Sequence, residues 1–130
     1  MQIHTKRLNS TQGWREIAGR RIFFRSSWEY KFAVYLQVLK NKKKIADWAH
    51  EPQTFWFEGI RRGCTSYKPD FRIDNFDGSR EWLEVKGYYD AKSLTKIKRF
   101  RKYFPTEKLR LIDAKWFKAN SKKLAILKQN

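Results

Sequence analysis

Apolar residues recur at helical spacing in two long stretches of the chain. The first stretch follows the serine pair Ser26 and Ser27 and extends to about Lys42. Its apolar face carries Trp28, Phe32, Tyr35, Leu36 and Leu39. The second stretch lies between Gly87 and Pro105, and its apolar face carries Leu94, Ile97, Phe100 and Phe104. This spacing predicts two amphipathic helices, the first with a serine N-cap.

The other apolar runs are short and rich in aromatic and β-branched residues, which is typical of strands. They cover residues 45–48, 54–57, 67–73, 81–85 and 108–112, and residues 14–24 predict a further short strand or extended segment. Asp77 and Gly78 predict a tight hairpin turn between the third and fourth runs. After a helical crossover, the fifth run can return beside this hairpin as a parallel strand. Residues 114–127 predict a weaker helix.

This order of elements predicts an α/β fold class with a mixed central sheet flanked by helices. At 130 residues, with no internal repeat and no long polar linker, the chain has the size of one domain. We therefore expect a single domain over residues 1–130. Residues 24–112 would form its core, and residues 1–13 would form a flexible basic arm.

The charge balance narrows the partners. Thirty Lys and Arg residues face 13 Asp and Glu residues, giving a net charge of +17, which favours a polyanion such as DNA. No stretch approaches the ~20 consecutive apolar residues of a spanning helix, and no signal pattern begins the chain. We expect a soluble, intracellular protein that binds no membrane.

Cysteine and histidine chemistry has little support in the sequence. Cys64 is the single cysteine and has no neighbours at zinc-ligand spacing. His4 and His50 are the two histidines, and neither lies in a motif for nucleophilic catalysis. We assign no role to these three residues.

Acidic residues and a lysine converge on the predicted hairpin. Alternation along its second strand sends Leu83 and Val85 to one face and Glu84 and Lys86 to the other. The hairpin can bring Asp70 beside Glu84. Two adjacent carboxylates repel each other unless a cation lies between them, and hard oxygen ligands select Mg²⁺, with Mn²⁺ as a substitute. The sequence therefore predicts a magnesium site.

The order of these residues resembles a known signature. Tyr67-Lys68-Pro69-Asp70 followed by Glu84-Val85-Lys86 is similar to the motif of the PD-(D/E)xK nuclease superfamily. Members of that superfamily also place a glutamate on the first core helix, and Glu29 occupies this position after Ser26 and Ser27. The arrangement most resembles the phage endonuclease I group of Holliday-junction-resolving enzymes. The resemblance covers about residues 24–112.

The resemblance implies a restriction-endonuclease-like core and hydrolysis of phosphodiester bonds in DNA. Asp70, Glu84 and the Val85 carbonyl would ligate the first metal ion, and Glu29 would bind a second ion or its water. Lys86 would assist the attacking water. Enzymes of this group act as homodimers that cut opposing strands of a four-way junction, so the resemblance implies a homodimer and branched DNA.

Basic clusters would supply phosphate contacts around this site. We expect DNA-binding residues at Arg20, Arg21, Arg25, Lys42, Lys43, Lys44, Arg61, Arg62, Lys96 and Arg99. No base-reading motif is visible, which favours recognition of DNA shape over recognition of a long sequence.

Other interpretations stay open. A sequence-specific homing, restriction or repair endonuclease could use the same fold, and a non-catalytic nucleic-acid-binding protein would suit the charge equally well. In that second case Glu84 and Lys86 form a surface ion pair, and Glu29 merely favours the start of its helix. Tyr88, Tyr89 and Asp90 could line the site or serve packing. We expect Glu51 and Glu58 to be solvated.

Overall fold

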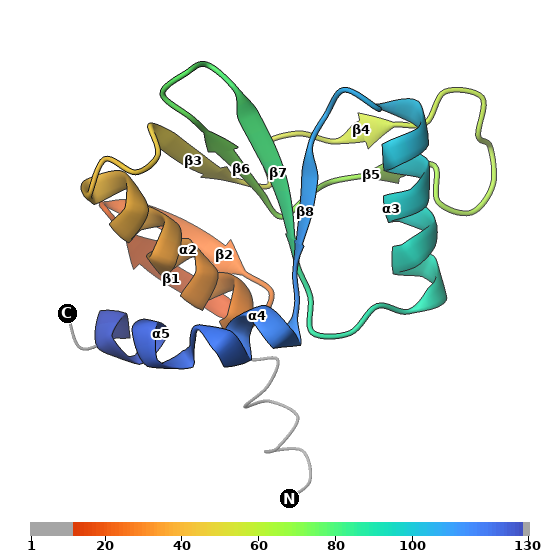
Figure 1. The fold of residues 1–130 in the computed structure, drawn as a ribbon. Helices are drawn as coiled ribbons and strands as arrows, with labels where there is room; N and C mark the ends of the chain where they lie inside the picture. Colours follow the sequence, from red (N-terminus) through yellow and green to blue (C-terminus); the bar gives the residue numbers. More distant parts are fainter. Residues whose placement is uncertain (1–11, 129–130) are drawn as a thin grey trace, which may run out of the picture.

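The chain is a mixed α/β protein in the computed structural model, which describes residues 12–128 (Figure 1). The strands are β1 (Gly13–Ile17), β2 (Arg20–Phe24), β3 (Asp47–His50), β4 (Phe55–Trp56), β5 (Ser66–Tyr67), β6 (Phe71–Asp74), β7 (Arg80–Val85) and β8 (Leu109–Ile112). The helices are α2 (Ser27–Asn41), α3 (Ala91–Tyr103), α4 (Ala114–Ala119) and α5 (Ser121–Lys128).

The central sheet has four strands in the order β3-β6-β7-β8. β3 and β7 both pair antiparallel with β6, and β8 pairs parallel with β7 after the crossover through α3. The predicted hairpin, crossover helix and parallel return are therefore confirmed. The turn at Asn75–Ser79 is tight because Gly78 adopts φ +89°, a conformation that costs glycine little.

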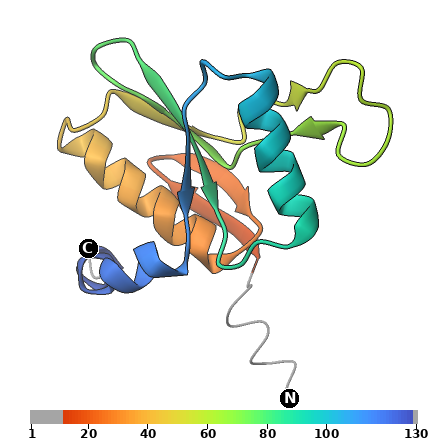
Figure 2. The same cartoon turned by 45° about the vertical axis from the view of Figure 1, so that its right-hand side comes forward.

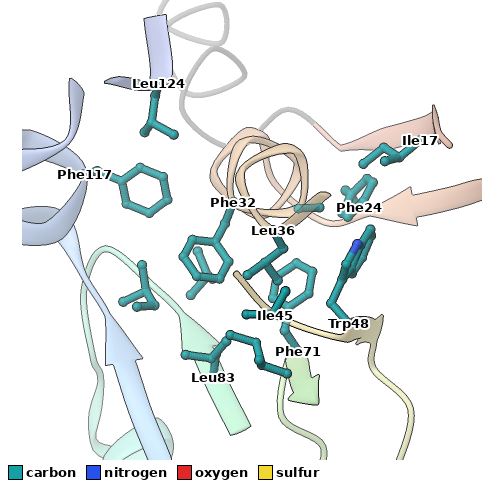
Figure 3. Close-up of a cluster of buried hydrophobic side chains, with 14 residues drawn as sticks. Ile17, Phe24, Phe32, Leu36, Ile45, Trp48, Phe71, Leu83, Phe117 and Leu124 are labelled. Atoms are coloured by element: carbon teal, nitrogen blue, oxygen red, sulfur yellow. The ribbon is translucent and has the colours of Figure 1, made fainter. Parts of the chain in front are cut away.

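The helices lie on opposite sides of the sheet, α2 on one and α3 on the other (Figures 1 and 2). On the α2 side, the β1–β2 hairpin, α4 and α5 complete the larger core, in which Phe32 and Leu36 of α2 pack against Phe71 and Leu83 (Figure 3). On the α3 side, Trp82 and Phe100 are fully buried against the short β4–β5 pair. Both faces of β7 are therefore covered, and its position is fixed from two directions.

Several predicted boundaries are wrong in detail. Residues 14–24 form a complete hairpin rather than one extended segment, because Ala18 and Gly19 both adopt positive φ and reverse the chain. Gly13 belongs to β1, so the expected arm cannot include it, and residues 1–11 lie outside the described residues.

Two further segments are interrupted. The predicted strand over 67–73 splits around Pro69, which has no N–H for a sheet ladder. The predicted C-terminal helix divides into α4 and α5 at Asn120. Among the described residues, no helix is long and apolar enough to cross a membrane.

Candidate active site

Three neighbouring strands bring acidic residues to the same end of the central sheet. The register of β3, β6 and β7 continues one step beyond the pairs made by Phe71. At that step Glu51, Asp70 and Glu84 occupy neighbouring positions. The Glu51 N–H donates to the Asp70 carbonyl oxygen at 2.8 Å, which holds the first two strands together there.

Glu29 enters the same region from α2. Ser26 caps this helix, as predicted, and its hydroxyl oxygen accepts from the Glu29 N–H at 3.2 Å. The Glu29 side chain then turns inward and is only 5% exposed. A glutamate that served only the helix dipole would stay in solvent, so the burial of Glu29 needs another explanation.

That explanation begins with His50 on β3. Its Nε2 lies 3.1 Å from Glu29 Oε2, and both side chains are buried. His50 thus lies beside Glu29 at the site, a position that the sequence analysis, which assigned His50 no role, did not predict. The available signal was the alternation of β3, which places His50 on the same face as the buried Trp48. The contact between His50 and Glu29 itself arises from tertiary packing.

Glu51 is also not solvated as expected. Its carboxylate lies 3.3 Å from Arg25 Nε and 3.8 Å from Lys68 Nζ, and its side chain is 18% exposed. Its backbone adopts φ +47°, an uncommon conformation for a residue with a side chain, directly before Pro52. Such strain is most often found at functional sites. Glu58, by contrast, is exposed as predicted.

Asp70 is the most perturbed carboxyl group of the site. Its Oδ2 accepts from the Val85 N–H at 2.8 Å, which fixes the loop before β6 to the end of β7. Burial raises the pKa of Asp70 well above its usual value, and the neighbouring charges of Glu84 and Glu29 raise it further. A buried carboxylate in this setting is stabilised by any cation that enters.

Glu84 lies beside it on β7. Burial raises the pKa of Glu84, whereas the hydroxyl of Tyr67, which donates to Glu84 Oε1 at 2.7 Å, lowers it in part. Burial and the charge of Glu84 in turn raise the pKa of Tyr67, so this hydroxyl keeps its proton and remains a donor. Tyr67 thus orients one oxygen of Glu84 and leaves the other available.

Lys86 follows at the end of β7. Its Nζ donates to Ser93 Oγ of α3 at 2.7 Å, and Ser93 is buried. The crossover helix α3 therefore positions the ammonium, whose charge lowers the pKa of Glu84. Among the described residues, Lys86 forms no close ion pair with Glu84. The plain alternative of a surface pair between Glu84 and Lys86 does not describe this arrangement.

These side chains open into a cleft of about 760 Å³. It is lined by Arg25, Ser26, Trp28, Glu29, Asp70, Glu84, Val85, Lys86, Gly87 and Tyr88. A second hollow of about 320 Å³ shares Arg25, Asp70, Glu84 and Lys86 with it and adds Lys96. The four predicted residues Glu29, Asp70, Glu84 and Lys86 are thus brought together in one cleft.

The residues after Lys86 have separate roles. A Cβ on Gly87 would lie 2.7 Å from the Trp28 ring, so only glycine lets the end of β7 approach α2 this closely. Tyr88 lines the cleft and is 74% exposed. The Tyr89 hydroxyl is buried without a hydrogen-bond partner among the described residues, and Asp90 caps α3 by accepting from the Ser93 N–H.

The predicted basic residues separate into two groups. Arg25 and Lys96 lie at the site, and Arg20 and Arg21 line an adjoining groove. The rest lie elsewhere or are occupied. Lys42, Lys43 and Lys44 follow the far end of α2, roughly 20 Å along the helix from Glu29, and Arg61 and Arg62 are exposed in the loop after β4. Arg99 donates to the Cys64 carbonyl oxygen at 2.7 Å, so we interpret it as structural.

The donor set suits a divalent cation. Asp70 and Glu84 offer carboxylate oxygens, which are ligands that Mg²⁺ and Mn²⁺ prefer, and Val85 lines the same cleft. Glu29, His50 and Glu51 form a second group whose possible ligand atoms all lie within 4.8 Å of one another. An imidazole nitrogen suits Mn²⁺ or other transition metals better than Mg²⁺.

No protein-family model, curated protein or solved structure matches this chain.

Proposed function

We propose that this protein is a Mg²⁺-dependent DNA endonuclease with a restriction-endonuclease-like core. One observation carries the proposal: Asp70, Glu84, Glu29 and Lys86, from three separate elements, converge in one cleft. Burial raises the pKa of both Asp70 and Glu84, the charge of Glu84 raises that of Asp70 further, and strongly perturbed carboxyl groups in a cleft are typical of functional sites. Among the described residues neither Asp70 nor Glu84 forms an ion pair, although the protein has a net charge of +17.

In this proposal the ion is held by Asp70, Glu84 and the Val85 carbonyl. When bound, it would supply positive charge that neutralises the scissile phosphate and acidifies the attacking water. Tyr67 and the Val85 N–H orient the two carboxylates before any substrate arrives, through bonds of 2.7 and 2.8 Å. Such preorganisation lowers the cost of reaching the transition state.

Lys86 acts on the substrate side. Ser93 holds its ammonium at 2.7 Å, at the rim that also carries Lys96. From there Lys86 can orient the attacking water and stabilise the charge that develops on the phosphate. Arg25, whose side chain lines the cleft and both neighbouring hollows, is suited to hold a flanking phosphate.

We further propose that the substrate is branched DNA, with Holliday-junction resolution by a homodimer as the most specific form. The support is the resemblance of Ser26–Glu29, Tyr67–Phe71 and Glu84–Gly87 to the phage endonuclease I group. A sequence-specific endonuclease on the same fold is the alternative, and substrate choice distinguishes the two.

The test compares a synthetic four-way junction with a linear duplex of matched sequence. Each is incubated with the protein in Mg²⁺ or in EDTA, and with the variants Asp70→Asn and Glu84→Gln. Glu58→Gln serves as the control, because Glu58 is an exposed glutamate outside the cleft. We expect Mg²⁺-dependent cutting of the junction, reduced about 1,000-fold in both site variants while binding persists.

Each outcome decides between the candidates. Cutting of linear duplex at one site would replace junction resolution with the sequence-specific alternative. If neither substrate is cut in Mg²⁺ or Mn²⁺, while both are bound, a non-catalytic nucleic-acid-binding protein is the better account. Equal loss of activity in Glu58→Gln would contradict the assignment of the site.

A further inference from the structure

The outer face of the β1–β2 hairpin carries aromatic side chains in solvent. Trp14 and Phe23 form a cross-strand pair and are 55% and 37% exposed. Their rings meet edge to face, with centroids 5.5 Å apart. The inner face of the same hairpin is different, because Ile17 and Phe24 are buried in the core. The core therefore does not account for Trp14 and Phe23.

Arg21 packs against this aromatic pair, and further arginines line the groove beside it. The Arg21 guanidinium lies 5.2 Å from the centre of the Trp14 ring. Arg20, Arg21, Phe23 and Arg25 line a groove of about 750 Å³ between the hairpin and β3. Glu16 lies opposite Arg21 in the register, so the outer face also holds one acid. Cations beside exposed rings are the combination that binds single-stranded nucleic acid, through phosphate contacts and base stacking.

The groove is continuous with the candidate active site. Arg25 lines the groove, the main cleft and the smaller hollow beside Lys96. His50 and Glu51 form the wall of the groove nearest the site. A nucleic-acid strand that passes through the cleft can therefore continue past Arg25 along this groove toward Phe23.

Local charge indicates the occupant. Arg21 and Arg25 beside the rings favour an anionic partner and oppose the packing of this face against the same face of a second copy. Base pairs in a duplex stack on their neighbours, so their π-faces are covered, whereas unpaired bases offer free π-faces to aromatic side chains. Unpaired nucleotides therefore fit the rings and the arginines together.

We propose that the outer face of the β1–β2 hairpin and the groove beside it bind unpaired nucleotides of DNA, with bases stacked on Trp14 and Phe23 and phosphates on Arg21 and Arg25. This inference rests on the proposed function and deepens it. It explains how a nuclease without a base-reading motif distinguishes an open or branched region from intact duplex.

The test measures binding rather than cleavage. A fluorescent oligo-dT of about 12 nucleotides and a blunt duplex are titrated in EDTA with Asp70→Asn protein, and anisotropy gives both affinities. Trp14→Ala and Phe23→Ala are then added singly in this background. Trp56→Ala and Phe76→Ala are matched controls, because each removes an exposed ring of the same type from a different surface.

We expect each hairpin variant to weaken oligo-dT binding about ten-fold and duplex binding less than about two-fold. The controls should change neither affinity by more than about two-fold. Trp14→Phe keeps a ring and should restore most of the affinity, which separates lost stacking from a misfolded hairpin. Sedimentation velocity on the same proteins follows the oligomeric state.

Three results would overturn the inference. They are unchanged oligo-dT affinity in the hairpin variants, an equal fall for oligo-dT and duplex, and a dimer that dissociates in those variants with oligo-dT affinity intact. Failure of the proposed function is distinguishable. A protein that binds oligo-dT through Trp14 but cuts no DNA would support this surface and contradict the nuclease assignment.

Discussion

The two halves of the candidate site treat their acids differently. On the α2 and β3 side, Glu29 meets His50 at 3.1 Å and Glu51 meets Arg25 at 3.3 Å. On the β6 and β7 side, Asp70 accepts from the Val85 N–H and Glu84 accepts from the Tyr67 hydroxyl. The acids of the first half lie at ion-pair distance from basic side chains, whereas Asp70 and Glu84 accept from neutral donors and Lys86 and Lys96 act on Glu84 only through their charge.

This difference indicates where a cation has most to contribute. Neutral donors orient Asp70 and Glu84 but do not cancel their charges, and their pKa values stay raised. A divalent ion between Asp70 and Glu84 would offset both the cost of burying the two charges and the repulsion between neighbouring carboxylates. Glu29 and Glu51 already have nearby basic groups. They are therefore better suited to assist a bound ion than to be its main ligands.

The largest effect on this comparison is expected at His50. His50→Ala removes the imidazole nitrogen that lies 3.1 Å from Glu29 Oε2 and leaves the buried Glu29 carboxylate without this partner. We expect cleavage to fall about 10- to 100-fold, the usual cost of losing a group that orients a ligand. Measuring the Mg²⁺ concentration for half-maximal cleavage checks this, because that value should rise.

His50→Gln is the matched control for that experiment. Its amide can still donate to Glu29, so most of the activity should return. Urea denaturation of both variants reports the structural cost separately. If His50→Ala lowers stability but leaves the rate and the Mg²⁺ requirement unchanged, His50 serves the core alone.

A second change acts where the two halves meet. Gly87→Ala places a Cβ 2.7 Å from the Trp28 ring, which is stacked on Phe117 with centroids 4.6 Å apart. Because Phe117 prevents the Trp28 ring from moving away from the added methyl group, we expect the free energy of unfolding to fall by about 1–3 kcal/mol. Chemical denaturation measures this loss.

The matched variant is Gly87→Ala combined with Trp28→Phe, which makes room for the added methyl group. The double variant should lose less stability than the sum of the two single changes. An additive result would show that Gly87 and Trp28 do not interact, and would remove the link between the end of β7 and α2.

The smallest effect is a pH dependence in the half held by neutral donors. The folded-state pKa of Asp70 is raised above its usual value of 3.8, so the folded protein keeps a proton that the unfolded chain releases. Stability contributed by this group is therefore lost as pH rises from about that value toward the folded-state pKa, by at most about 1.4 kcal/mol per pH unit. Asp70→Asn lacks this loss.

In EDTA, the free energy of unfolding of Asp70→Asn should thus increase relative to that of wild type as pH rises. Urea denaturation over a pH series measures the difference, and the new amide oxygen can still accept from the Val85 N–H. Mg²⁺ should then stabilise wild type more than the variant. A difference that stays constant with pH would mean that Asp70 is not perturbed.

Much of the fold was predictable because local signals were strong. The helical spacing from Trp28 to Leu39 and the Asp77-Gly78 turn identified α2 and the β6–β7 hairpin, and both are confirmed. The β1–β2 hairpin was not predicted as such. Its turn uses Ala18 at φ +50°, and alanine carries no signal for that conformation.

For the candidate site, motif spacing placed Asp70, Glu84 and Lys86 on one hairpin, and helix capping placed Glu29 at the start of α2. The partners of these residues were not predictable in the same way. Tyr67, Ser93 and Val85 take their roles from distances of 2.7–2.8 Å set by packing. Glu51 was expected in solvent because nothing local signals its contact with Arg25.

The sequence by itself determined the order of elements, the faces of the strands and the excess of positive charge, since these depend on local periodicity and composition. Only the tertiary structure decided that His50 contacts Glu29 and that neutral donors orient Asp70 and Glu84. It also decided that Arg25 lines the cleft and both neighbouring hollows. The reason is physical. Burial, pair distances and pKa shifts depend on how elements distant in sequence pack together, and that packing has no local signature.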